Sequence, residues 1–120
     1  MSLIGPDFIA LQVRDPDASA RFWETRLGLV RAERSPPDAV VFDTRPIPFA
    51  LRRPLVDLDA GGPPGHGVSL WLAAESAETI HGEVAEHGLE IVRPLADGPF
   101  GRAFTFRDPD GYLITVHDAR

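Results

Sequence analysis

Cysteine is missing from this sequence, and its absence excludes several kinds of chemistry. Without a thiol the chain cannot form disulfides, thiolate nucleophiles or zinc–sulfur sites. Lysine is missing as well, so the 12 basic residues are all arginine. The glycine pair Gly61-Gly62 therefore lacks the lysine, and also the following helix, of a phosphate-binding loop. The serines lie in no nucleophile-elbow motif, so nothing in the sequence indicates a nucleophilic triad.

Long apolar runs and basic stripes are also lacking. No segment approaches membrane-spanning length, and Met1-Ser2-Leu3 lacks the charged and apolar regions of a signal peptide. The net charge of -6 argues against nucleic-acid binding. We therefore expect a cytoplasmic protein with neither a membrane nor a nucleic acid as its partner.

What the sequence does contain fits one ordinary globular domain. Its 120 residues suffice for a real core but not for two independent ones. The hydrophobic fraction of 43% and the charged fraction of 25% are typical of such domains. We therefore expect a single domain over residues 1–120.

A turn near the C-terminus, Arg107-Asp108-Pro109-Asp110-Gly111-Tyr112, is the clearest structural signal. Asp108 suits the first position of a type I turn, Pro109 presets the second, and Gly111 can take the left-handed conformation that follows. Alternating β-forming residues flank the turn at 103–107 and 112–117. The pattern predicts a hairpin with a type I turn and a glycine bulge.

The rest of the chain repeats one unit twice. In the first half, the strand predicted at 8–13 is followed by a helix that Asp15 and Pro16 begin and Gly28 ends. Further strands are predicted at 29–33, 39–43 and 48–53. In the second half, a strand at 67–73, a helix from Ser76 to Gly88 and a strand at 89–94 precede the hairpin.

These patterns predict two tandem βαβββ modules, at about residues 7–54 and 66–118, joined by a proline- and glycine-rich linker at about 55–65. The expected fold class is α+β. Its eight strands would form one curled mixed sheet, an open barrel around a cavity, with one helix outside each half.

The order and spacing of several short motifs resemble the vicinal oxygen chelate superfamily, which includes glyoxalase I, extradiol dioxygenases, fosfomycin-resistance enzymes and bleomycin-resistance proteins. The resemblance rests on Leu11-Gln12-Val13-Arg14-Asp15, on Ala20-Arg21-Phe22-Trp23 with Leu27-Gly28-Leu29, and on Pro99-Phe100-Gly101-Arg102 with residues 104–111. It covers nearly the whole chain. It implies the fold just described and says little about the reaction, because one fold hosts many functions.

The resemblance also implies where a divalent metal would be held. Enzymes of the superfamily use His, Gln or Glu at four inward-facing strand positions, which correspond here to Phe8, Ala50, Gly67 and Thr115. None of these residues carries an imidazole or a carboxylate. We therefore expect no metal and no cofactor. The departure favours the bleomycin-resistance-like branch, whose members give antibiotic resistance by sequestering ligands without transforming them.

A displaced metal site remains an alternative. Gln12 and His117 keep the inward parity of their strands, and His66 lies one residue before an expected ligand position. A site built from these three side chains would make the protein a metal-dependent lyase, isomerase or dioxygenase.

Strand parity predicts which side chains line the cavity, while apolar residues of the opposite parity pack under the helices. Trp71 and Phe8 would form an aromatic wall, and Arg52 could pair with an anionic group. A mixture of aromatic and polar side chains is typical of small-molecule pockets. The full candidate set for ligand binding is Phe8, Gln12, Arg52, Ser69, Trp71, Phe100, Leu113, Thr115 and His117.

Three functions remain open at this point. The first, which we favour, is non-catalytic binding of a planar or aromatic small molecule. The second is the metal-dependent enzyme, and the third is a protein whose aromatic side chains fill the cavity and whose role is assembly with a partner. We also expect a homodimer, because each half-barrel leaves sheet edges that need covering.

Overall fold

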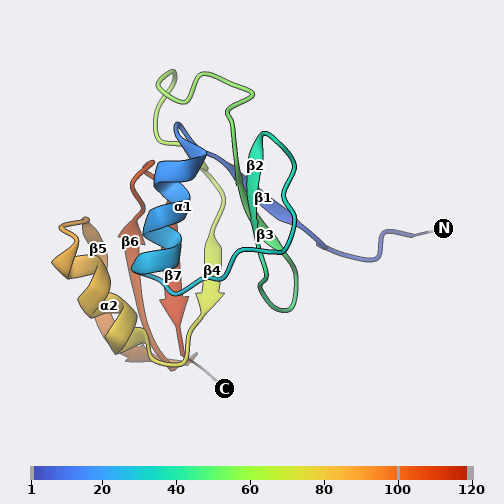
Figure 1. Cartoon of the computed structure of the whole chain (residues 1–120). Helices are drawn as coiled ribbons and strands as arrows, with labels where there is room; N and C mark the ends of the chain where they lie inside the picture. The colour runs from blue at the N-terminus through green and yellow to red at the C-terminus, as the bar shows by residue number, and fades with distance from the viewer. Residues whose placement is uncertain (1, 100, 119–120) are drawn as a thin grey trace. The chain divides into compact units, whose positions relative to one another are not determined.

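The computed structural model of the protein describes residues 2–99 and 101–118. They belong to two compact units, Met1–Leu58 and Asp59–Arg120, and the boundary falls inside the predicted linker. Each unit combines one helix with one mixed sheet (Figure 1). Among the described residues, no helix is long and apolar enough to cross a membrane.

The first unit contains β1 (Ile9–Gln12), α1 (Pro16–Thr25), β2 (Ala39–Phe42) and β3 (Phe49–Arg52). The sheet order is β1-β3-β2, with β1 parallel and β2 antiparallel to the central β3. α1 packs on β2 and β3. Its fully buried Trp23 lies 5.0 Å from the ring of Phe49, which stacks on Phe42. As predicted, Asp15 caps the helix, because its Oδ1 accepts from two N–H groups of the first turn.

The strand predicted at 29–33 is present only as a short pairing along β2. Arg31 forms an isolated bridge with Phe42, and the N–H of Ala32 donates to the carbonyl of Val41 over 2.8 Å. The N–H of Val41 donates instead to Ser35 Oγ over 2.9 Å. The pairing therefore stops where a side chain takes the hydrogen bond that a longer strand would need.

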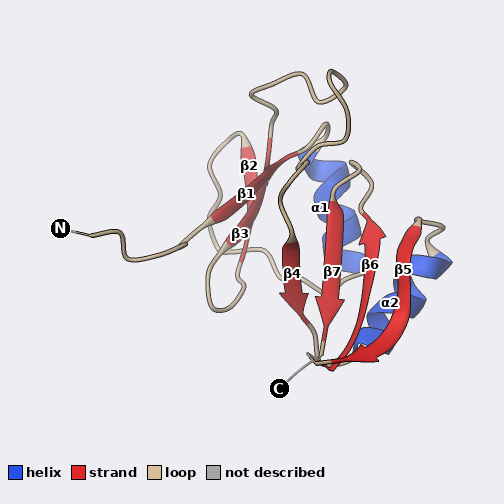
Figure 2. Ribbon diagram, turned by 180° about the vertical axis from the view of Figure 1, so that it is seen from behind, coloured by secondary structure: helices blue, strands red, loops and turns tan. Residues whose placement is uncertain are grey.

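The second unit contains β4 (Leu70–Ala73), α2 (Ala77–Glu86), β5 (Ile91–Gly98), β6 (Gly101–Arg107) and β7 (Leu113–His117). The sheet order is β4-β7-β6-β5. α2 covers one face of this sheet (Figure 2) and contacts β5, β6 and β7. The side chains of that face are buried: Phe104, Phe106, Ile114 and Val116. The opposite face carries the remaining side chains of each strand.

β5 extends beyond its predicted end at Pro94 and runs to Gly98. A proline inside a strand removes one ladder donor, which is tolerated at an edge or a bulge. Both conditions hold here, because β5 is an edge strand and its register with β6 shifts on either side of Arg93. The fifth predicted strand, at 67–73, is shorter in the structure than predicted, since β4 begins at Leu70 rather than at Gly67.

The predicted α+β class is therefore confirmed, whereas the number of strands is not. The described residues contain seven strands in sheets of three and four, rather than eight strands in one curled sheet. The repeat is still visible in the pairing. Adding the short segment at Arg31 beside β2 gives the first unit the order β1-β3-β2-segment, which matches β4-β7-β6-β5 in the second.

The predicted hairpin turn between β6 and β7 is formed around the side chain of Asp108. Its Oδ1 accepts from the N–H of Asp110 (3.0 Å) and of Tyr112 (2.9 Å), while its own carbonyl accepts from Gly111. Gly111 has a φ of 101°, as the predicted bulge requires. Burial of Asp108 raises the pKa of its carboxyl to about 6, although the hydrogen bond from Tyr112 opposes the rise.

The linker between the units is held by specific contacts. Gln12 Oε1 accepts from the N–H of Leu55 (2.6 Å) and of Val56 (3.2 Å). Further along, Gly65 lies so close to Tyr112 that an added Cβ would meet the ring at 2.9 Å. The start of the predicted linker is therefore hydrogen-bonded to the first unit, and its end packs against the hairpin turn of the second.

Candidate functional site

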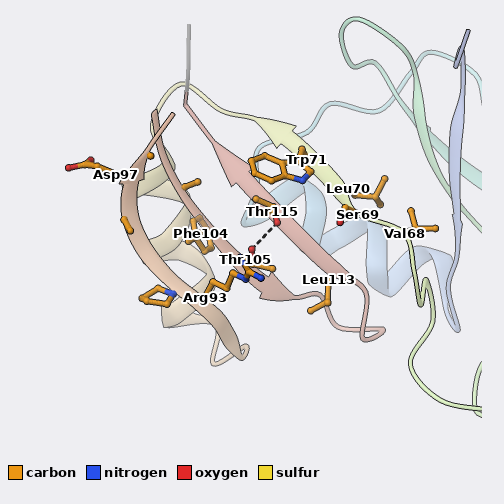
Figure 3. A pocket seen from close by; sticks show the side chains of 14 residues that line it. Val68, Ser69, Leu70, Trp71, Arg93, Asp97, Phe104, Thr105, Leu113 and Thr115 are labelled. Carbon is orange, nitrogen blue, oxygen red and sulfur yellow. Dashed lines mark hydrogen bonds between the residues drawn. The ribbon is translucent and has the colours of Figure 1, made fainter. Parts of the chain in front are cut away.

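A pocket of about 370 Å³ lies within the second unit, on the face of the four-stranded sheet opposite α2 (Figure 3). The side chains that open onto it come from all four strands. This follows from strand geometry, because alternate residues of each strand point to the same face. The apolar residues between them fill the core under α2.

One row of side chains crosses the whole sheet in register. Trp71 on β4 pairs with Thr115 on β7, which pairs with Thr105 on β6. Thr105 in turn pairs with Arg93 on β5. Because neighbouring strands lie about 4.8 Å apart, the row spans roughly 14 Å from Trp71 to Arg93. It places an aromatic ring at one end, a cation at the other and two hydroxyl groups between them.

The two hydroxyl groups are hydrogen-bonded to each other. Thr105 Oγ1 and Thr115 Oγ1 lie 2.8 Å apart, and either can donate (Figure 3). Only one of the two hydroxyl protons is used in this bond. The accepting hydroxyl therefore keeps its own O–H to donate elsewhere. The pair provides one polar point in the middle of the pocket floor.

Trp71 is accessible, unlike the other tryptophan. Its side chain is 51% exposed, whereas Trp23 is fully buried. The ring of Trp71 lies 6.0 Å from that of His117. Among the described residues, His117 Nδ1 is buried and has no hydrogen-bond partner. Phe8, the other side chain of the predicted aromatic wall, is 52% exposed.

The structure brings together four of the predicted ligand-binding residues around this pocket. Ser69, Trp71, Leu113 and Thr115 line it. His117 lies beside Trp71 at its margin. Phe100, which we predicted at the mouth, lies outside the described residues.

The other predicted residues belong to the first unit. Gln12 and Arg52 lie side by side, because their Cα positions pair between β1 and β3. The amide oxygen of Gln12 is occupied by the linker, so it serves the fold in a way that the prediction did not include. Arg52 Nε donates to the carbonyl of Arg53 over 3.1 Å. That these residues and Phe8 share a pocket with Trp71 stays a prediction.

Sequence reasoning missed three polar residues of the pocket: Arg93, Asp97 and Thr105. We derived inward parity from the four metal-ligand positions, which say nothing about β5 or β6. The alternation within residues 103–107 could have revealed Thr105, since it pairs with Thr115 across the predicted hairpin. Arg93 was hidden by the bulges around Pro94, which break the period of two.

The residues at the superfamily's metal positions do not fit a divalent cation. Phe8 and Ala50 offer no donor atom, Gly67 has no side chain, and Thr115 offers a hydroxyl that already bonds Thr105. Over residues 2–99 and 101–118, no group of three His, Cys, Asp or Glu side chains could hold a metal ion. Of the displaced site that was the alternative, His66 lies in an exposed loop and the amide oxygen of Gln12 accepts from the linker. That site stays a prediction.

Comparison with known families agrees with this architecture. Residues 5–116 match the Glyoxalase/Bleomycin resistance protein/Dioxygenase superfamily. The chain belongs to this superfamily. The resemblance seen in the sequence is thereby confirmed, and the repeated βα unit with its parallel β4–β7 and β1–β3 pairs is the superfamily's fold in this chain.

Several solved structures have a fold similar to that of this chain. One is TioX from a Micromonospora species, with 22% identity, 97% of this chain and 100% of that chain covered, and a TM-score of 0.72. Another is TnmS3, an antibiotic binding protein from a Streptomyces species, with 20% identity, 100% and 99% coverage and a TM-score of 0.70. A protein of unknown function from Agrobacterium tumefaciens is 26% identical, with 100% and 95% coverage and a TM-score of 0.75. No curated protein sequence matches the chain.

Proposed function

We propose that this superfamily member binds a planar, aromatic small molecule on the face of its second sheet and holds it without transforming it. The observation that carries the proposal is the half-exposed ring of Trp71 beside the Thr105–Thr115 hydroxyl pair in a pocket of about 370 Å³. An aromatic wall with one polar point is the usual composition of a small-molecule site.

The volume and the chemistry of the pocket support the same class of ligand. A pocket of this size lies at the lower end of the range for ligand sites, so it suits a molecule of a few rings. Trp71 can stack on such a ring, and the free hydroxyl proton of the threonine pair can donate to a carbonyl or an oxyanion. The similar fold of an antibiotic binding protein adds support from outside the chain.

The residues at the superfamily's four metal-ligand positions favour sequestration over metal-dependent catalysis. The positions that hold a metal in enzymes of the superfamily carry no imidazole or carboxylate here. We therefore put forward no lyase, isomerase or dioxygenase activity. A role in antibiotic resistance follows as part of the proposal, since a protein that binds a toxic molecule tightly lowers its free concentration.

Calorimetric titration with 2-naphthamide, a neutral planar probe, tests this function. We expect saturable binding to the wild-type protein. Trp71→Ala should weaken it by roughly tenfold, because aromatic stacking contributes about 1 kcal/mol beyond the buried area. Val92→Ala, which shortens a half-exposed apolar side chain of β5 that does not line the pocket, is the control and should bind as the wild type does. Equal binding by Trp71→Ala would rule the site out.

The same titration can test the contribution of the first unit. If Phe8 shares the aromatic wall, Phe8→Ala should weaken naphthamide binding to a similar extent as Trp71→Ala. If binding is unchanged, the ligand is held by the second unit alone.

The expected homodimer is part of the same proposal, since paired chains would cover the edges of the two sheets. A monomeric mass by light scattering at micromolar concentration would contradict it.

A further inference from the structure

We propose that Arg93 makes the pocket selective for planar ligands that carry a negative charge, such as an aromatic carboxylate. The inference rests on the proposed function, because it concerns the same pocket. It assigns the role of anion partner, which the sequence suggested for Arg52, to a different arginine on β5.

The charges around the pocket are unevenly compensated. Its lining contains two charged residues, Arg93 and Asp97. Asp97 Oδ1 lies 3.3 Å from the guanidinium Nε of Arg102, so its charge already has a partner. Among the residues that the structure describes, the Arg93 guanidinium makes neither an ion pair nor a hydrogen bond. The lining therefore presents one cation that is free to pair with a ligand.

Arg93 is exposed to solvent and lies next to the threonine pair. Arg93 pairs with Thr105 across β5 and β6, between two register shifts of the bulged strand. In Figure 3 its side chain extends from β5 toward Thr105. An oxyanion at that point could accept from the guanidinium and from the free hydroxyl of the threonine pair together.

The geometry of the row sets the shape of the ligand. Its ring would lie on Trp71 and Thr115, and its anionic group would lie near Thr105 and Arg93, one or two strands away. A planar guanidinium matches a carboxylate with two parallel hydrogen bonds, which a lysine could not reproduce. A rigid aromatic acid therefore satisfies both ends of the row with one molecule.

Two probes that differ only in charge separate this inference from the proposed function. 2-Naphthoate carries a carboxylate, and 2-naphthamide carries a neutral group of nearly the same shape. We expect wild-type protein to bind naphthoate at least tenfold more tightly than naphthamide at low salt. The preference should shrink as salt is added, because the pair is partly exposed to solvent.

Substitutions of Arg93 identify the source of the preference. Arg93→Gln should weaken naphthoate binding by roughly tenfold to a hundredfold and leave naphthamide binding unchanged. Arg93→Lys should retain only part of the preference, since it keeps the charge and loses the two-pronged geometry. Arg21→Gln, on the exposed surface of α1, changes the net charge equally and should have no effect.

The outcomes distinguish the two proposals. Equal affinity for both probes in the wild type overturns the role of Arg93 and leaves the pocket in place. If Arg93→Gln binds neither probe, the role of Arg93 is also overturned, because the residue would then be needed for the fold of the pocket rather than for charge selectivity. If neither probe binds wild-type protein at millimolar concentration, the proposed function fails and the role of Arg93 fails with it.

Discussion

Replacement of Asp108 by asparagine should change how the stability of the protein depends on pH. The side chain is 3% exposed, and its Oδ1 accepts two backbone hydrogen bonds that close the β6–β7 turn. Among the described residues its Oδ2 has no partner. Asparagine can present the same accepting oxygen to the turn but cannot ionise. The substitution therefore tests the cost of burying the charge.

The sign of the effect follows from the raised pKa. The carboxyl has a pKa of 3.8 in an ordinary setting and about 6 in the folded protein, because burial disfavours the charged form. As pH rises from about 4 to about 6, the unfolded chain loses this proton before the folded one does. The folded state then binds more protons, so the free energy of unfolding falls as pH rises. The stabilising contribution is complete below about pH 4 and lost above about pH 6.

The size of the effect follows from the same shift. A change of one pKa unit corresponds to about 1.36 kcal/mol, so a shift of about two units gives roughly 3 kcal/mol. Urea unfolding of wild type and Asp108→Asn at pH 4, 5, 6 and 7 measures it. The variant should gain stability relative to the wild type by up to about 3 kcal/mol between pH 4 and pH 7.

Two further variants check the cause. Like Asp108→Asn, Asp7→Asn removes one negative charge, but from the exposed surface and outside the turn, and it serves as the matched control. Asp110→Asn removes a neighbouring charge that raises the pKa of Asp108. Between pH 4 and pH 7 this variant should therefore lose less stability than the wild type does. A constant difference between Asp108→Asn and the wild type at pH 4 and pH 7 would refute the reasoning.

Three other substitutions test contacts that each lie within one of the two units. Gly65→Ala should lower the free energy of unfolding by about 1–3 kcal/mol, because its Cβ would meet Tyr112 at 2.9 Å and its φ is 74°; Gly61→Ala, with a φ of 77° and no atom within 4 Å, should cost less in the same urea titration. Asp118→Ala should cost about 1–2 kcal/mol by the same assay, since its carboxylate accepts from the first N–H of α2 and from the start of β6. Gln12→Ala should accelerate hydrogen exchange of the two linker amides that now donate to its side chain, with little change in global stability.

Features that depend on neighbouring residues could be predicted from the sequence. The Asp15 cap and the turn at Asp108 are both formed by hydrogen bonds within five residues. Their geometry is set by local backbone preference, so the residue types alone indicate it. The internal repeat could be predicted for the same reason, because each copy carries its own local signals.

Features that depend on pairing between strands were harder to predict. The strand at 29–33 was lost because the Ser35 side chain takes a backbone donor from β2, which no propensity of residues 29–33 reveals. Arg93 reaches the pocket only because bulges around Pro94 shift the register of β5. Gln12 was expected in the cavity on parity alone, but parity does not indicate that a distant linker would bind its amide oxygen.

The indole N–H signals of the two tryptophans give the most direct test of the central claim, which is that the ligand lies on the second sheet against Trp71. A ¹⁵N–¹H correlation spectrum should show one signal from the half-exposed Trp71 and one from the buried Trp23, assigned with Trp71→Phe. On titration with 2-naphthoate, we predict that the Trp71 indole and the amides of Thr105 and Thr115 shift together while the Trp23 indole stays in place. Saturable binding that leaves the Trp71 indole and both threonine amides unmoved would contradict the account.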